Sequence, residues 1–133
     1  MDKYHCYQNA VQCVEAEIDF VEATFAAIKG RPARTLREDF CGTAQTACEW
    51  VQRHRDNQAW GVDLDPLVMQ WGEHNNVAVM DPKQQANVTL LEADVMTAPI
   101  KQMDAVLAMN FSYFIFMERL QIFRYFKSVK ESL

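Results

Sequence analysis

Three features that would assign a function directly are missing from this 133-residue sequence. No run of five basic residues occurs, so no nucleic-acid footprint is visible. No apolar stretch approaches the ~18 residues that cross a bilayer. No two of the four cysteines form a Cys-x-x-Cys pair, so neither a zinc site nor a thioredoxin-like motif is indicated. The polar residues from Asp2 onward do not resemble a signal peptide. Together these absences favour a cytoplasmic protein with reduced thiols.

Half of the residues are hydrophobic and the net charge is −5, a composition that predicts one packed domain. Short apolar runs alternate with amphipathic segments, which is typical of an α/β fold with a parallel sheet. An apolar stripe at helical spacing predicts a helix over 7–29, with Ile28 on its inner face. Strands are predicted at 34–40, 58–63, 88–91 and, buried on both faces, 105–109. A second helix is predicted at 43–54. A third begins at Asp65-Pro66, an N-cap followed by proline, and turns Leu67, Val68 and Trp71 inward. A last helix is predicted at the end of the chain.

Three acidic residues stand at the carboxyl ends of three predicted strands. They are Glu38, Asp63 and Asp94. In an open parallel sheet, ligands bind outside these strand ends, where the loops converge. Acceptors spread along one edge suit an elongated ligand such as a nucleoside with a cationic amino-acid tail. S-adenosylmethionine is the expected cofactor.

The string from Leu36 to Ala44, Leu-Arg-Glu-Asp-Phe-Cys-Gly-Thr-Ala, resembles the first motif of class I S-adenosylmethionine-dependent methyltransferases. That motif usually reads acid-x-Gly-x-Gly-x-Gly. Gly42 keeps the central glycine, whereas Phe40 and Ala44 replace the outer two, which leaves the shape of the loop open. The chain resembles a bacterial subgroup in which this string is preceded by a Tyr-x-x-Ala-Val-Gln helix, here beginning at Tyr7.

The resemblance implies a Rossmann-like parallel sheet with flanking helices, strand order 3-2-1-4, preceded by an N-terminal helix. Residues 1–133 would form one partial methyltransferase domain, with 1–30 as a helical cover and 31–133 as the donor-binding core. In the family a fifth strand and a closing antiparallel pair follow. The isolated chain is therefore expected to have weak activity or none, and its methyl acceptor is not identified.

The resemblance also assigns roles to individual residues. Asp63 would bind the ribose hydroxyls, and Leu64 would pack on the adenine. Asp94 would accept a hydrogen bond from the adenine amino group, and the backbone N–H of Val95 would reach a nitrogen of the adenine ring. The remaining donor contacts would come from Glu38 and Asn110 at the methionine ammonium and from the loop of Phe40, Gly42, Thr43 and Ala44. Phe111 and Tyr113 would line the acceptor pocket, and no metal is expected.

Each acid has a simpler interpretation. Asp63 could be a surface acid, and Asp94 could stabilise its own turn. Glu38 could be a buried acid paired with Arg37 or Arg34. Cys41 stands near a helix start, where a thiolate would be favoured, and is interpreted as packing.

Two other functions stay open. One is an inactive remnant that binds S-adenosylmethionine or only dimerises, and the less favoured one is an NAD-dependent oxidoreductase. The fourth strand would lie unpaired at the edge of the sheet, and the last helix would expose Phe123 and Phe126. Because such surfaces pair with another chain, we expect a homo-oligomer that forms through the strand or the helix.

Overall fold

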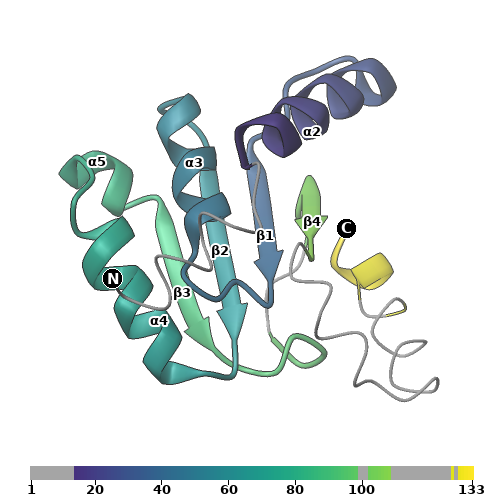
Figure 1. The fold of residues 1–133 in the computed structure, drawn as a ribbon. Helices are drawn as coiled ribbons and strands as arrows, with labels where there is room; N and C mark the ends of the chain where they lie inside the picture. The colour runs from purple at the N-terminus through teal and green to yellow at the C-terminus, as the bar shows by residue number, and fades with distance from the viewer. Residues whose placement is uncertain (1–13, 99–101, 109–126, 128) are drawn as a thin grey trace.

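The computed structural model describes residues 14–98, 102–108, 127 and 129–133. Its elements in chain order are α2 (Val14–Lys29), β1 (Thr35–Asp39), α3 (Gln45–Arg53), β2 (Gln58–Asp63), α4 (Pro66–Gly72), the π-helical turn η1 (Glu73–Val77), α5 (Pro82–Gln85), β3 (Val88–Glu92) and β4 (Ala105–Leu107) (Figure 1). Residues 129–132 form a further helical turn. No helix within these ranges is long and apolar enough to cross a membrane.

The four strands form one parallel sheet in the order β3-β2-β1-β4, which confirms the predicted architecture. Glu38 in β1 pairs with Gly61 in β2, and Asp63 at the end of β2 pairs with Glu92 at the end of β3. The carboxyl ends of these three strands therefore lie along one edge of the sheet, at the bottom of Figure 1.

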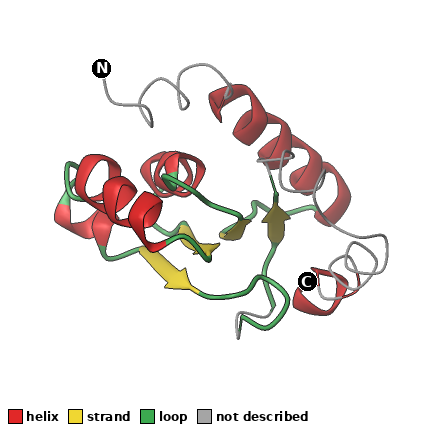
Figure 2. Ribbon diagram, turned by 60° about the horizontal axis from the view of Figure 1, so that its bottom comes forward, coloured by secondary structure: helices red, strands yellow, loops and turns green. Residues whose placement is uncertain are grey.

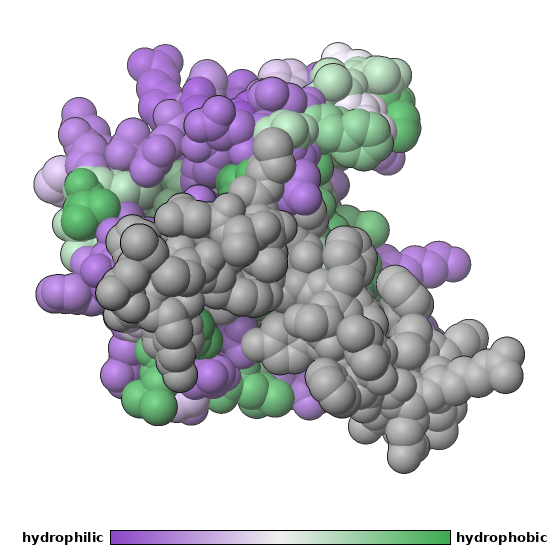
Figure 3. Space-filling view, in the orientation of Figure 1, coloured by the Kyte–Doolittle hydropathy of each residue, from purple (hydrophilic) through white to green (hydrophobic). Residues whose placement is uncertain are grey.

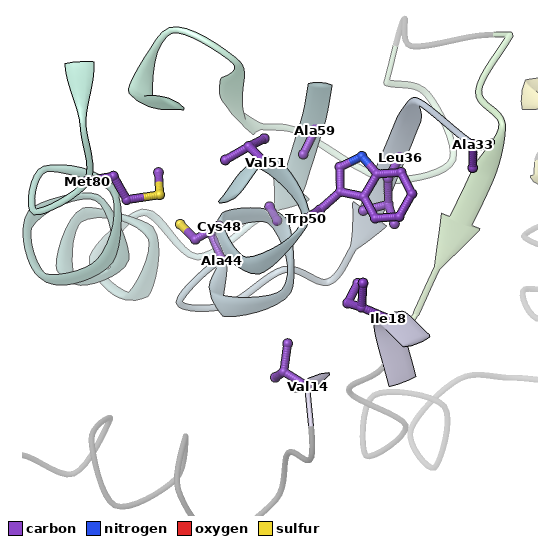
Figure 4. Close-up of a cluster of buried hydrophobic side chains, with 11 residues drawn as sticks. Val14, Ile18, Ala33, Leu36, Ala44, Cys48, Trp50, Val51, Ala59 and Met80 are labelled. Atoms are coloured by element: carbon purple, nitrogen blue, oxygen red, sulfur yellow. The ribbon is translucent and has the colours of Figure 1, made fainter. Parts of the chain in front are cut away.

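One face of the sheet is covered by α2 and α3. Trp50 and Ile18 are fully buried there and pack with Leu36 of β1 and Ala59 of β2 (Figure 4). The Trp50 indole also donates to the Arg34 carbonyl at 3.1 Å, so its polar end is satisfied inside the core. Figure 2 shows these helices on the same side of the sheet.

The opposite face is covered by the segment after β3 and by the last helical turn. Val62, Val95 and Ala98 are buried together there, with Val129 packed against them. A fully buried ion pair joins Arg37 and Asp39 at 2.7 Å on this side of β1. Arg37 also donates to the Ser132 hydroxyl at 2.9 Å, which fixes the last turn to the sheet.

Asp104 joins the start of β1 to the start of β4. Its carboxylate accepts from the Arg31 guanidinium at 2.9 Å and from the backbone amides of Arg34 at 2.7 Å and Thr35 at 3.2 Å. Burial works to raise the pKa of Asp104, but these bonds outweigh it, and the net effect lowers the pKa. The carboxylate thus stabilises the fold in its ionised form.

The helix predicted over 7–29 is confirmed from Val14 onward, and 7–13 lies outside the described residues. The inward position predicted for Ile28 is wrong, since this side chain is 73% exposed. It belongs to the last turn of α2, which extends past the sheet in Figure 1. Phe20 is also exposed, and Figure 3 shows apolar surface in the region of α2.

Two further predictions need correction, and one short helix has no counterpart among the predictions. The inward position predicted for Val68 is confirmed, but Leu67 is 68% exposed because it lies in the first turn of α4 on the solvent side, and Met69 is buried in its place. The polar stretch from Asp81 to Asn87 contains α5, which starts with a capping box between Asp81 and Gln84. β4 is half-buried rather than buried on both faces, because among the described residues it pairs only with β1.

Candidate functional site

The loop of residues 40–44, here called the first-motif loop, connects β1 to α3 in an unusual backbone conformation. Phe40, Gly42 and Ala44 all have positive φ, at 54°, 52° and 61°. These are the three positions where the first motif of the methyltransferases carries glycine. For a residue with a Cβ, this conformation costs roughly 1–2 kcal/mol. The loop therefore adopts a conformation that glycine favours at two positions that carry a Cβ, Phe40 and Ala44.

Hydrogen bonds donated by its own backbone amides hold the first-motif loop in place. The Gly42 amide donates to the Asp63 carboxylate at 2.8 Å, and the Cys41 amide donates to the Val62 carbonyl at 3.0 Å. The Ala44 amide closes the turn onto the Cys41 carbonyl at 2.8 Å. These bonds anchor the loop to the end of the neighbouring strand.

Cys41 is a packing residue under this loop. It is 2% exposed and lies in a small apolar cluster with Val68 and Met69 of α4. The missing side chain of Gly61 makes room for it, since a Cβ there would come 3.0 Å from the Cys41 sulfur. Burial, reinforced by nearby acids, raises the pKa of the thiol. The sulfur is therefore protonated and unsuited to act as a nucleophile.

Glu38 is 1% exposed and faces the start of α3, where it accepts from the Ala47 amide at 3.1 Å. Burial raises its pKa to about 8, and the Ala47 amide and the Thr46 side chain oppose that rise. The alternative of an arginine partner is wrong. Arg37 pairs with Asp39, and Arg34 donates to Asn57.

Asp63 is 4% exposed and connects two loops. One carboxylate oxygen accepts from Gly42, and the other accepts from the Asp65 amide at 3.1 Å. A carboxylate has about four acceptor positions, so each oxygen keeps a lone pair for a further donor. The alternative of a simple surface acid does not fit this burial. Asp65 is the N-cap of α4, as predicted, and accepts from Leu67 at 3.0 Å.

Asp94 follows β3 and is exposed. Its Oδ1 accepts from the Met96 amide at 2.8 Å, and its carbonyl accepts from Thr97 and Ala98, so it does stabilise its own turn. This local role uses one carboxylate oxygen and leaves the second for another donor. Val95 is buried beneath the turn. On the neighbouring strand, Leu64 is 67% exposed immediately after Asp63, although it is apolar.

The structure thus gathers most predicted site residues at one sheet edge: Glu38, the first-motif loop, Asp63, Leu64, Asp94 and Val95. Asn110, Phe111 and Tyr113 lie outside the described residues. Sequence reasoning missed two residues beneath the loop, Gly72 and Asn76, both of which contact Thr43. The only available signal was a glycine within a helical pattern, which suggests close packing.

Comparison with solved structures adds to this geometry. The chain superposes on an S-adenosylmethionine-bound amino pentose methyltransferase from Micromonospora echinaspora with a TM-score of 0.74 and 17% identity, covering 100% of this chain and 52% of that one. A sugar N-methyltransferase from Streptoalloteichus gives a TM-score of 0.74 and 19% identity, with 100% and 49% covered. The chain has the fold of S-adenosylmethionine-dependent methyltransferases.

A glycopeptide N-methyltransferase in complex with S-adenosylmethionine matches over 84% of this chain and 48% of that one, with a TM-score of 0.67 and 17% identity. The chain therefore spans about half the length of these methyltransferases. No protein-family model matches the sequence. No curated protein matches it either.

Proposed function

We propose that this chain binds S-adenosylmethionine at the carboxyl ends of β1, β2 and β3 and forms the donor-binding part of a methyltransferase. The observation that carries the proposal is the first-motif loop, whose three left-handed residues stand where the methyltransferase motif has glycines. Two of the structures with this fold contain S-adenosylmethionine, which supports the choice of ligand. The methyl acceptor is a separate question, and the residues we assign to it, Phe111 and Tyr113, lie outside the described part of the chain.

The residues at the edge fit the chemical groups of this ligand. Asp63 keeps an acceptor position on each oxygen, as two adjacent ribose hydroxyls require. Leu64 presents an exposed apolar surface beside it, which suits one face of the adenine. The second oxygen of Asp94 lies one strand further along and suits the adenine amino group. A ligand that covers Leu64 would also remove apolar surface from water.

The methionine end would lie at the first-motif loop and the start of α3. Backbone amides at a helix N-terminus favour a carboxylate. When bound, S-adenosylmethionine supplies a methyl group activated by its sulfonium, for in-line transfer to a nucleophile. The residues of this chain need only orient the donor and exclude water.

Calorimetric titration tests the proposal. The purified chain should bind S-adenosylmethionine and S-adenosylhomocysteine, and it should not bind NAD. Asp63→Ala should weaken donor binding by about 1.5–3 kcal/mol, because it removes hydrogen bonds to a charged acceptor. Asp65→Ala is the matched control, since it removes a carboxylate two residues away that caps α4 and should leave affinity within about twofold.

Asp94 is tested with a second ligand. Asp94→Ala should weaken the binding of S-adenosylhomocysteine more than the binding of an analogue that lacks the adenine amino group. Only S-adenosylhomocysteine can lose a hydrogen bond from this amino group to the Asp94 carboxylate. Equal losses for both ligands would refute the adenine role. Binding of NAD without S-adenosylmethionine would overturn the proposed function and favour an oxidoreductase.

A further inference from the structure

The first-motif loop has a second support, from the helix that follows β2. Gly72, the last residue of α4, lies against the backbone of Thr43. A Cβ placed on Gly72 would come 2.4 Å from the Thr43 carbonyl oxygen and 2.8 Å from its Cα, closer than such atoms pack. Only glycine allows the helix and the loop to touch in this way.

Asn76 adds a directed bond to the same group. Its Nδ2 donates to the Thr43 carbonyl at 2.9 Å, across 33 positions of the sequence. The adjacent Asn75 makes an equivalent bond, also at 2.9 Å, but to the Trp71 carbonyl of its own helix. Two neighbouring asparagines of one turn therefore have different roles, since only Asn76 reaches the loop.

The turn that carries Asn76 is the π-helical η1, closed by the bond from the Ala78 amide to the Glu73 carbonyl at 2.8 Å. Such wide turns occur often at functional sites. Gly72 and Asn76 continue the inner face of α4, on which Val68 and Met69 pack against Cys41. This one face thus supports the loop from Cys41 to Thr43.

We propose that Asn76 and Gly72 are positioning residues for the methyl donor, holding the Thr43 backbone so that the first-motif loop fits the methionine end of the ligand. This inference rests on the proposed function. The adenine end depends on Leu64 and Asp94, which belong to other loops. Loss of the support should therefore affect ligands that carry the amino-acid tail and spare those that lack it.

The test compares Asn76→Leu with Asn75→Leu. Both asparagines lie in η1, and each substitution removes a side-chain hydrogen bond to a backbone carbonyl. Titrations use S-adenosylhomocysteine and 5′-methylthioadenosine, which lacks the amino-acid tail. Asn76→Leu should lower the affinity for S-adenosylhomocysteine roughly tenfold and the affinity for 5′-methylthioadenosine less than about twofold. Asn75→Leu should leave both within about twofold. Equal losses for the two ligands, or equal losses in the two variants, would overturn the proposal.

A second readout needs no ligand. Amide hydrogen exchange at Gly42 and Ala44 should accelerate in Asn76→Leu and stay at the wild-type rate in Asn75→Leu. Unchanged exchange in both would show that Asn76 does not hold the loop. If Asn76→Leu fails to fold, Asn76→Asp keeps the side-chain shape and removes the donor, with the same expectations. A wild-type chain that binds neither nucleoside would refute the donor assignment itself, while the exchange rates would still decide whether Asn76 supports the loop.

Discussion

Glu38 should make the fold less stable as the pH rises. Its pKa is raised by burial to about 8 in the folded chain, against an ordinary value of 4.5. The folded state therefore holds a proton that the unfolded state loses, and the free energy of unfolding falls with pH between these two values. Each pH unit in this range costs about 1.4 kcal/mol. At pH 7 the penalty relative to pH 4.5 is about 3 kcal/mol, and above pH 8 it no longer grows.

Glu38→Gln removes this penalty. The amide oxygen can still accept from Ala47, so the variant should match the wild type near pH 4.5 and exceed its stability by about 3 kcal/mol at pH 7. Urea denaturation followed by tryptophan fluorescence across pH 4.5–8 measures the difference. Glu92→Gln is the control, because Glu92 is an exposed acid at the same edge of the sheet and should keep the wild-type slope. If Glu38→Gln and the wild type lose stability in parallel over this range, the reasoning is refuted.

Two other changes test the fold, and a third tests association. Asp104→Ala should lower stability by about 2 kcal/mol at pH 7, through lost bonds to a charged acceptor. Because the pKa of Asp104 is lowered, the part of that loss that depends on its charge should shrink as the pH falls from the ordinary value of 3.8 through the lowered pKa. Gly72→Ala should cost about 2 kcal/mol in urea denaturation, because its methyl group would collide with the Thr43 backbone; wild-type stability would contradict the contact. We also expect the chain to associate, since Leu107 in β4 lines an apolar hollow of about 380 Å³ beside Phe20 of α2. Leu107→Lys should then give monomers in sedimentation, with unchanged circular dichroism, whereas a wild type that is monomeric at micromolar concentration would refute the association.

The sheet could be predicted from the sequence because its strands are short apolar runs bounded by clear breaks. The sequence predicts a strand over 58–63, and β2 spans Gln58–Asp63. The start of α4 can also be predicted from the sequence, because Asp65 is a favourable N-cap and the fixed φ of Pro66 suits the first helical position. The strand order came from the family resemblance, because local patterns do not encode which strands become neighbours.

Hydrophobic periodicity does not predict α5. Its residues, Pro82–Gln85, carry no apolar stripe and none is buried, so periodicity gives no signal. The capping signal was nevertheless present, because Asp81 stands three residues before Gln84 in the pattern of a capping box. Glu38 shows a different limit. Its burial could be anticipated from its place in the motif, but its partner could not, because the backbone amide of Ala47 carries no sequence signature.

The first-motif loop has a shape that its local sequence does not predict. Phe40 and Ala44 each resist a positive φ, so local preference alone predicts a different turn. A strained conformation persists only where the surroundings over-determine it. Here Asp63 holds the Gly42 amide from one side, and Gly72 of α4 and Asn76 of η1 contact the Thr43 carbonyl from the other. These contacts join residues at least 21 positions apart, beyond the reach of any local rule. The shape of the loop is thus a tertiary effect, and substitutions that release Thr43 should alter the loop more than Phe40→Gly or Ala44→Gly would.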